Sequence, residues 1–237
     1  MSRSENVAHM YQTLDIAKVR ETIDRLGQRI QDRFPDSGLQ HIAEELSLIS
    51  IETETRTAYI AEPQVALRIA IGVVITVALV VLAYGLSQIQ IAESAFRLDE
   101  LVQFLDGALN TAVIVGAAVF FLVTVENKIK RKRALNGLHQ LRSITHVIDM
   151  HQLTKDPIST VGGGPTPSSP ARTMTPFESS RYLDYCAELL SLTAKLAAVY
   201  GQSIQDREVL AAVSEIESLT SDLSRKIWQK IGGLKFD

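Results

Sequence analysis

The chain has 237 residues, with 24 lysines and arginines against 27 aspartates and glutamates, and a formal net charge of −3. This mild charge excludes a generally basic nucleic-acid-binding protein. A single cysteine, Cys186, excludes an intrachain disulfide framework and a zinc site built from cysteines alone. Charged residues are absent from residues 69–92 and from residues 107–125, so the apolar residues are concentrated in two runs.

Residues 1–62 are predicted to form an N-terminal helical hairpin. Apolar residues recur every three or four positions in two runs, which is the spacing of a core-facing helix, and Pro35 and Gly38 separate the runs. The many charges of this segment indicate that no secretory signal peptide precedes the first apolar run. The core positions are Ile16, Val19, Ile23, Leu26, Ile30 and Phe34, followed by Leu39, Ile42, Leu46 and Ile49.

Residues 63–126 are predicted to be a transmembrane hairpin, with spans at about 65–87 and 104–125 and an outer connector at 88–103. Each uncharged run is long enough to cross a hydrocarbon core of about 30 Å at about 1.5 Å per residue. Neither run has the polar side of a helix at a protein surface. Pro63 predicts a break before the first span. The alternative is a very apolar helical hairpin buried inside a soluble bundle.

The charges that flank the spans predict the orientation. Residues 88–106 contain one basic residue and four acidic ones, whereas five basic residues directly follow the second span. The positive-inside rule therefore predicts that both termini are cytoplasmic, which places the spans of a prokaryotic protein in the bacterial inner membrane. The five residues are also candidates for binding anionic lipid headgroups, with a purely topological role as the alternative. They are Lys128, Lys130, Arg131, Lys132 and Arg133.

A basic juxtamembrane helix is predicted at 127–156, with its helical part continuing to about Leu153, and a Pro/Gly/Ser linker at 157–176. Residues 177–237 are predicted to form a C-terminal helical hairpin. Thr175, Pro176 and Glu178 make a capping box at its start, and Gly201 is expected to end its first helix. The core positions, given in chain order, are Tyr182, Cys186, Leu189, Thr193, Leu196, Tyr200, Val209, Val213, Ile216, Thr220, Leu223, Ile227 and Ile231.

Cys186 lies among these core positions, so we expect a buried, unreactive thiol. No strand pattern occurs in the sequence. The predicted fold class is therefore an all-α membrane protein in which a two-span transmembrane helical hairpin is flanked by cytoplasmic helical hairpins.

The second span has two distinct sides. Polar residues at spacings of four, three and four form a polar side, and small residues four apart form a small side roughly opposite. Small residues let helices approach closely, so this side is predicted to pack on the first span or on another subunit. The polar side then lines the mouth of a cation-favouring pore, unless it simply faces solvent. The polar side comprises Asp99, Gln103, Asp106 and Asn110, and the small side Ala108, Ala112 and Gly116.

A histidine side of the following helix comprises His139, Arg142, His146 and Asp149. Three interpretations compete: a face with structural salt links, an interface or ligand-sensing contact, and a metal or acid–base site completed by Asp184 or Glu188. The spacing does not match a His-Glu-x-x-His motif, and no nucleotide-binding or nucleophile motif occurs. We therefore predict no catalytic residue, no metal and no cofactor.

The favoured function is a membrane module in which cytoplasmic helices control a self-associating hairpin, forming a homo-oligomeric pore in the lipid bilayer. The alternative is a membrane-anchored scaffold whose coiled-coil-like helices recruit a cytosolic protein partner. A third hypothesis, an enzyme, rests on the histidine side alone. In layout, the two spans between helical modules are similar to small two-helix membrane effectors of bacterial defence systems, such as the SLATT type.

Overall fold

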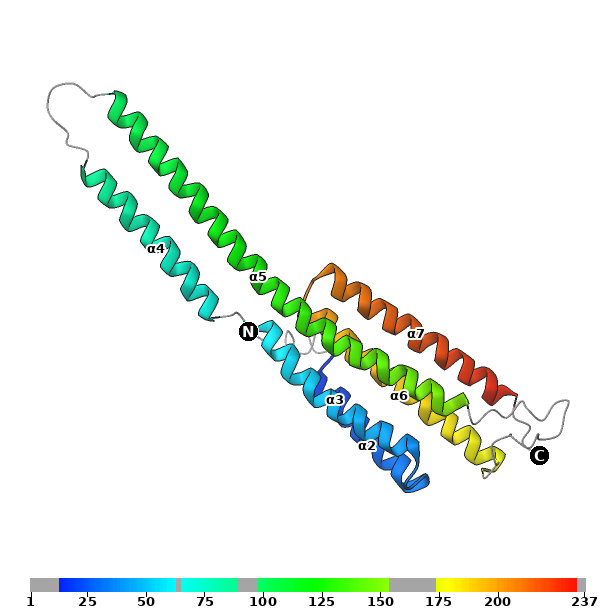
Figure 1. The fold of residues 1–237 in the computed structure, drawn as a ribbon. Coiled ribbons are helices and arrows are strands. Elements are labelled where there is room, and N and C mark those ends of the chain that lie inside the picture. Colours follow the sequence, from blue (N-terminus) through cyan, green and yellow to red (C-terminus); the bar gives the residue numbers. More distant parts are fainter. Residues whose placement is uncertain (1–12, 63–64, 89–97, 154–173, 234–237) are drawn as a thin grey trace, which may run out of the picture. The chain divides into compact units, whose positions relative to one another are not determined.

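The computed structural model describes residues 13–62, 65–88, 98–153 and 174–233, and in these residues every regular element is a helix (Figure 1). The prediction of an all-helical fold is confirmed for these residues. The chain divides into two compact units, which we describe separately: a helical unit of residues 1–61 and 131–237, and an apolar unit of residues 62–130. The helices are α2 (Ile16–Arg33), α3 (Gly38–Ala61), α4 (Val65–Gln88), α5 (Leu98–Leu153), α6 (Pro176–Ser203) and α7 (Arg207–Gly232).

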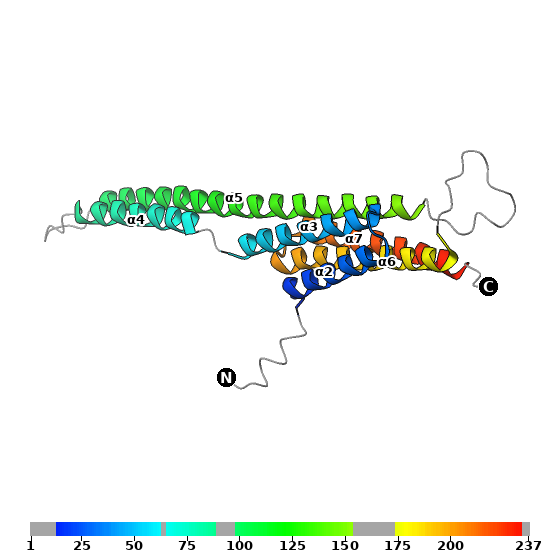
Figure 2. The ribbon, with the colours of Figure 1, turned by 90° about the horizontal axis from the view of Figure 1, so that it is seen from below.

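Helix α6 is the central element of the helical unit. It packs against α2, α3 and α7, and these helices run side by side in two perpendicular views (Figures 1 and 2). The part of α5 that belongs to this unit buries Leu138, Leu141 and Ile148 in the same core. Thirteen residues of α6 are buried, because helices cover it on most sides. The apolar positions predicted for α2 and α3 are confirmed as core, with Ile16 only partly buried.

Helix α2 ends at Arg33 and α3 begins at Gly38, so the predicted break between the two runs is confirmed. Asp36, and not Gly38, adopts the left-handed backbone conformation, with φ of 55°. Gly38 is the first residue of α3, and a Cβ at this position would collide with the imidazole of His151. The glycine therefore leaves room for the His151 ring of α5, and the aspartate makes the turn.

The two threonines in the predicted core of the C-terminal hairpin are buried without an energetic penalty from unpaired hydroxyls. Thr193 donates to the carbonyl oxygen of Leu189 at 2.8 Å, and Thr220 donates to that of Ile216 at 2.9 Å. Each hydroxyl is thus satisfied by its own helix, one turn earlier, and can lie among apolar side chains.

The predicted end of α6 at Gly201 is wrong. The helix continues to Ser203, and the N–H of Ile204 caps it by donating to the carbonyl oxygen of Tyr200. Gly201 is buried, and a Cβ there would lie 3.4 Å from Leu210 and 3.7 Å from Val213 of α7. The small residue is explained by close packing of two helices and does not mark a helix terminus.

The predicted capping box at the start of α6 is confirmed. The hydroxyl oxygen of Thr175 accepts from the N–H of Glu178 at 3.2 Å, and the carboxylate of Glu178 accepts from the N–H of Thr175 at 2.8 Å. These hydrogen bonds from Thr175 stabilise the ionised carboxylate and lower the pKa of Glu178 below its ordinary value of 4.5.

We expect acid to weaken this capping box. Because the folded-state pKa of Glu178 is lowered, its contribution to stability is present above about pH 4.5 and is lost as the pH falls through the folded-state value. A Glu178→Gln variant keeps an acceptor oxygen but does not titrate. The difference in unfolding free energy between the two proteins, measured by denaturant titration, should be constant above pH 4.5 and shrink below it. A difference that is independent of pH down to pH 3 would contradict the role of the carboxylate.

The apolar unit contains α4 and the first part of α5. Both helices are long and apolar enough to cross a membrane. Helix α3 ends at Ala61 and α4 begins at Val65, in agreement with the break predicted at Pro63, although residues 63–64 themselves lie outside the described residues. None of the 18 consecutive residues that form the most apolar part of each helix is buried. The contrast with the packed helical unit is the main feature of this part of the chain.

Candidate functional site

The side chains of the polar side that the structure describes are all exposed. Gln103, Asp106 and Asn110 lie on one side of α5, near its start, and for Asp99 only the helical backbone is described. Thr111, next to Asn110, instead donates its hydroxyl to the carbonyl oxygen of Gly107 at 2.8 Å. Among the side chains described at this helix end, the exposed polar ones are therefore those of the polar side.

At Gly116 the small side has no close neighbour among the described residues. A Cβ placed on Gly116 would meet no atom within 4 Å. The same holds for Gly107, at the start of the second uncharged run, and for Gly72 in α4. Ala112 is exposed and Ala108 is half-buried. The part of this side at Ala112 and Gly116 is thus open to contact by lipid or by another polypeptide.

Large apolar side chains are exposed over most of the circumference of each apolar helix, and the remaining side, with Ile71, Val74, Val115 and Val119, is half-buried. Because a helix in water normally exposes one polar side, such a large exposed apolar surface needs a non-aqueous environment or a protein partner. Those exposed by more than half include Ile69, Val73, Val77, Val80, Leu109, Val113, Ile114, Phe120 and Phe121.

The basic segment, which we define as Lys128 and residues 130–133, is held by contacts in both units. In the apolar unit, Lys130 pairs with Glu126 at 2.9 Å and donates to the carbonyl oxygen of Glu62 at 3.1 Å. The side chains of Lys130 and Glu126 are only 14% and 20% exposed, so this pair is better shielded from solvent than the other ion pairs of the described chain. Lys130 therefore connects α5 to the main chain at Glu62, directly after the end of α3.

In the helical unit, two further residues of the basic segment contact different helices. Arg131 pairs with Glu208 at 2.7 Å and lies 3.9 Å from Asp206, the residue that caps the N-terminus of α7. The guanidinium of Arg133 lies 3.7 Å from the ring centre of Tyr59 in α3, a cation–π contact. Lys128 and Lys132 are exposed, which leaves them accessible to anionic groups.

The structure does not bring the histidine side together as one cluster. Arg142 pairs with Glu215 of α7 at 2.9 Å, and the carboxylate of Asp149 accepts from Gln152 one turn later. His139 and His146 are exposed. Of the two ligands considered from α6, Asp184 pairs with Arg181 at 2.8 Å and Glu188 pairs with Arg29. Within the described residues, no group of three or more histidines, cysteines and acidic residues is placed to hold a metal ion.

Cys186 is fully buried, as predicted. Burial in the core raises the pKa of its thiol to about 12, against a smaller opposing effect of Lys230. A thiol with this pKa carries almost no thiolate near neutral pH, so it does not act as a nucleophile.

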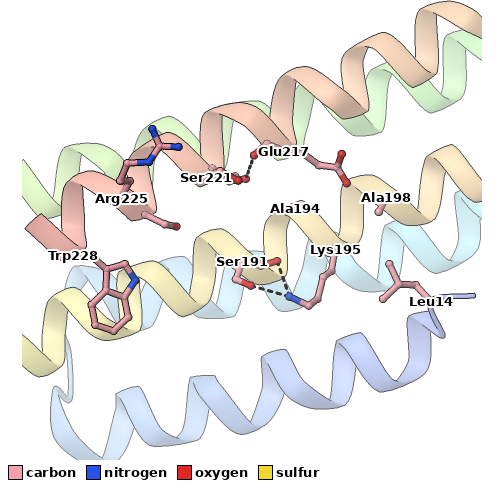
Figure 3. Close-up of a pocket in the computed structure, with 11 residues that line it drawn as sticks. Leu14, Ser191, Ala194, Lys195, Ala198, Glu217, Ser221, Arg225 and Trp228 are labelled. Carbon is pink, nitrogen blue, oxygen red and sulfur yellow. Dashed lines mark hydrogen bonds between the residues drawn. The ribbon is translucent and has the colours of Figure 1, made fainter. Parts of the chain in front are cut away.

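A groove between α6 and α7, which the sequence analysis missed, lies on the surface of the helical unit (Figure 3). Its volume is about 550 Å³. The available signal was the spacing of small residues along α6, at Ser191, Ala194 and Ala198, on the side opposite the predicted core. The remaining lining residues are Leu14, Lys195, Glu217, Thr220, Ser221, Ser224, Arg225 and Trp228.

Comparison with protein-family models, with curated proteins and with solved structures finds no match for this chain. A functional conclusion therefore rests on the residues and contacts described above.

Proposed function

We propose that this chain is an integral membrane protein whose α4 and α5 form a self-associating two-span hairpin, and that the assembled hairpins form a pore controlled by the helical unit. The observation that supports this most directly is the large exposed apolar surface of α4 and α5, in a chain whose other unit has an ordinary packed core. Lipid and neighbouring hairpins together would remove that surface from water.

The orientation in this proposal follows from the basic segment. Lys128 and Lys132 are free to contact phosphate groups at the cytoplasmic face, where each would contribute about 1 kcal/mol of attraction. Both termini then lie in the cytoplasm, together with the helical unit. Arg68, exposed near the start of α4, can extend its guanidinium to the same interface.

The pore in this proposal is lined by the polar side. Gly116 and Ala112 provide a surface on which a helix of another subunit can approach closely. Packing on that surface turns Gln103, Asp106 and Asn110 toward the interior of a ring. Carboxylates at the mouth attract cations, and the apolar residues further along the helix form the constriction.

Control by the helical unit is supported by the contacts of the basic segment. Arg131 is held by Asp206 and Glu208 at the start of α7. Helix α5 continues without interruption from residue 98 to residue 153. A displacement of α7 would therefore act on the same helix that carries the polar side.

Ion flux through liposomes that contain the purified chain tests the pore. We expect Asn110→Leu to remove a polar lining group and Gly116→Leu to block helix approach, and each to reduce cation flux by about tenfold or more, the equivalent of about 1.4 kcal/mol. Thr111→Leu is the matched control, because it also replaces a polar residue with leucine but lies between the two sides. Flux in this variant should stay close to that of the unchanged chain.

Subunit counting in nanodiscs provides a second measurement. A single subunit per particle at all protein-to-lipid ratios would contradict self-association, since two helices cannot enclose a pore. Equal loss of flux in the Thr111→Leu control would contradict the assignment of the polar and small sides.

A further inference from the structure

The groove along the central helix α6 is left open among the described residues. Helices α2, α3 and α7 pack against α6, and so does α5 through Gly137, which lies against Tyr200. Between α7 and α2, however, the floor formed by Ser191, Ala194 and Ala198 is covered by no described helix (Figure 3). Small side chains at this spacing allow another helix to lie closely on the floor.

Helix α3 carries an apolar ridge, which we define as Leu48 and Ile51, on the side turned away from the core. Leu48 is 59% exposed and Ile51 is 47% exposed. Exposed carboxylates lie three or four residues from Leu48 and therefore beside it on the helix surface, and α3 has no lysine or arginine before residue 56. These carboxylates belong to Glu44, Glu45 and Glu52. The α3 ridge thus combines apolar contact area with negative charge.

The groove has the complementary charge. Lys195 and Arg225 line it, against a single acidic lining residue, Glu217. The ammonium of Lys195 donates to the hydroxyl of Ser191 at 2.8 Å and has two further protons to donate. Arg225 lies 3.4 Å from Asp222, and both side chains are more than half exposed, so the guanidinium is accessible to further carboxylates. The basic groups of the groove can therefore contact an acidic helix.

Helices α3 and α6 run in the same direction. In the second half of α3, the hydroxyl of Thr53 lies 3.5 Å from that of Tyr200, near the end of α6. In the first half of α6, Glu188 pairs with Arg29, which lies four residues before the end of α2 and thus close to the turn that leads into α3. Corresponding ends of α3 and α6 are therefore neighbours.

The ridge and the floor consequently lie at the same level of the helical unit. Ala194 precedes Tyr200 by six residues, and Ser47 precedes Thr53 by six, so Ala194 is level with Ser47 and its neighbour Leu48. Seen from the groove, α3 runs behind α6, so the ridge and the floor open on different sides of the unit (Figure 3). Two such surfaces at one level meet when identical subunits stand side by side around an axis along their helices.

We propose that the α3 ridge of one subunit docks in the groove between α6 and α7 of a second copy, so that neighbouring helical units join head to tail. Repetition of such a contact closes a ring. Because the hairpins hold the copies in one membrane, the effective concentration of the surfaces is high and a small interface is sufficient. This inference rests on the self-association proposed above, but not on ion conduction.

Disulfide crosslinking of the full chain in liposomes tests this contact. The chain carries Leu48→Cys and Ala194→Cys, which lie on different sides of one subunit and therefore join only between subunits. Mild oxidation should produce a ladder of linked dimers, trimers and higher species, since each subunit uses both surfaces. Cys186 does not compete, because it is buried.

Thr55→Cys combined with Ala194→Cys is the matched control. Thr55 is exposed on the same side of α3 as Leu48, but about two turns further along, so we expect several-fold less crosslinking. Equal yields from the two pairs would contradict the level of the contact. Dimers that form to the same yield from the Leu48→Cys chain alone would show that two ridges meet, and would overturn the head-to-tail contact.

Subunit counting in nanodiscs separates this inference from the proposed function. Oligomers that give no crosslinked ladder would overturn the contact between helical units and leave the self-association of the hairpins intact. A single subunit per particle would contradict both.

The charge of the groove is tested in the same crosslinking chain. Arg225→Glu places a carboxylate opposite the acidic surround of the α3 ridge, so we expect several-fold less of the ladder. Lys226→Glu is the matched control, because Lys226 is exposed but does not line the groove. Equal crosslinking in both variants and in the parent pair would remove the charge complementarity that assigns the groove to a second copy, and would overturn that assignment.

Discussion

Replacing Gly137 with alanine should destabilise the helical unit by about 3 kcal/mol. A Cβ at this position would overlap the hydroxyl of Tyr200 and lie 3.1 Å from its Cε1 atom. Tyr200 is fully buried and cannot move aside without disturbing α3, since its hydroxyl lies 3.5 Å from that of Thr53. The overlap therefore outweighs the gain of about 1 kcal/mol in helix propensity that alanine normally brings.

Chemical denaturation of the full chain, followed by Trp228 fluorescence, measures this effect. Gly27→Ala is the matched control, because Gly27 is also helical but a Cβ there would lie 3.8 Å from its nearest neighbour, Ala43. We expect the control to be neutral or slightly stabilised. Adding Tyr200→Phe to Gly137→Ala should recover part of the loss. Equal stability of the two alanine variants would show that α5 and α6 are not packed as described.

An arginine in the middle of α4 should have the second large effect. Val77→Arg places a charge at the centre of the first apolar run, which costs about 2.5–3.5 kcal/mol if that run lies in lipid. Such a penalty reduces membrane integration on the order of 100-fold. The measurement is the fraction of chain that resists carbonate extraction from membranes.

Leu48→Arg is a stringent control for this prediction. Leu48 in α3 is 59% exposed and Val77 is 57% exposed, so the two positions are equally accessible in the single chain. Only Val77 is expected to be surrounded by lipid, and a surface substitution such as Leu48→Arg changes stability by about 0.5 kcal/mol or less. Integration that is insensitive to both substitutions would rule out a lipid environment for α4.

Local features of the sequence were predicted correctly where one short-range effect decides the structure. The capping box at Thr175 needs only the first turn of α6, and the buried sides of α2, α3 and α7 follow from apolar spacing. Gly201 shows where such reasoning failed, and Gly38 has a packing contact that the sequence did not reveal. Both glycines are small because another helix, or the ring of His151, approaches them, and that neighbour is far away in the sequence.

In the candidate site, too, the features set by local sequence were predictable and the contacts between distant residues were not. The polar side, the small side and the basic segment are visible in the sequence, because they depend on helix periodicity and charge alone. The partners of the basic segment were not predictable. Arg131 contacts residues 206 and 208, and Arg142 contacts residue 215, so the pairing depends on how α7 packs beside α5.

By itself the sequence determined that the chain is helical and that two of its helices are long and apolar enough to cross a membrane, because both properties depend on local composition and spacing. Only the tertiary structure decided that helices from before and after the apolar unit share one core around α6. It also decided that one side of α6 is left open between α7 and α2. Apolar spacing identifies a buried surface, but the identity of the partner that buries it depends on shape complementarity among five helices.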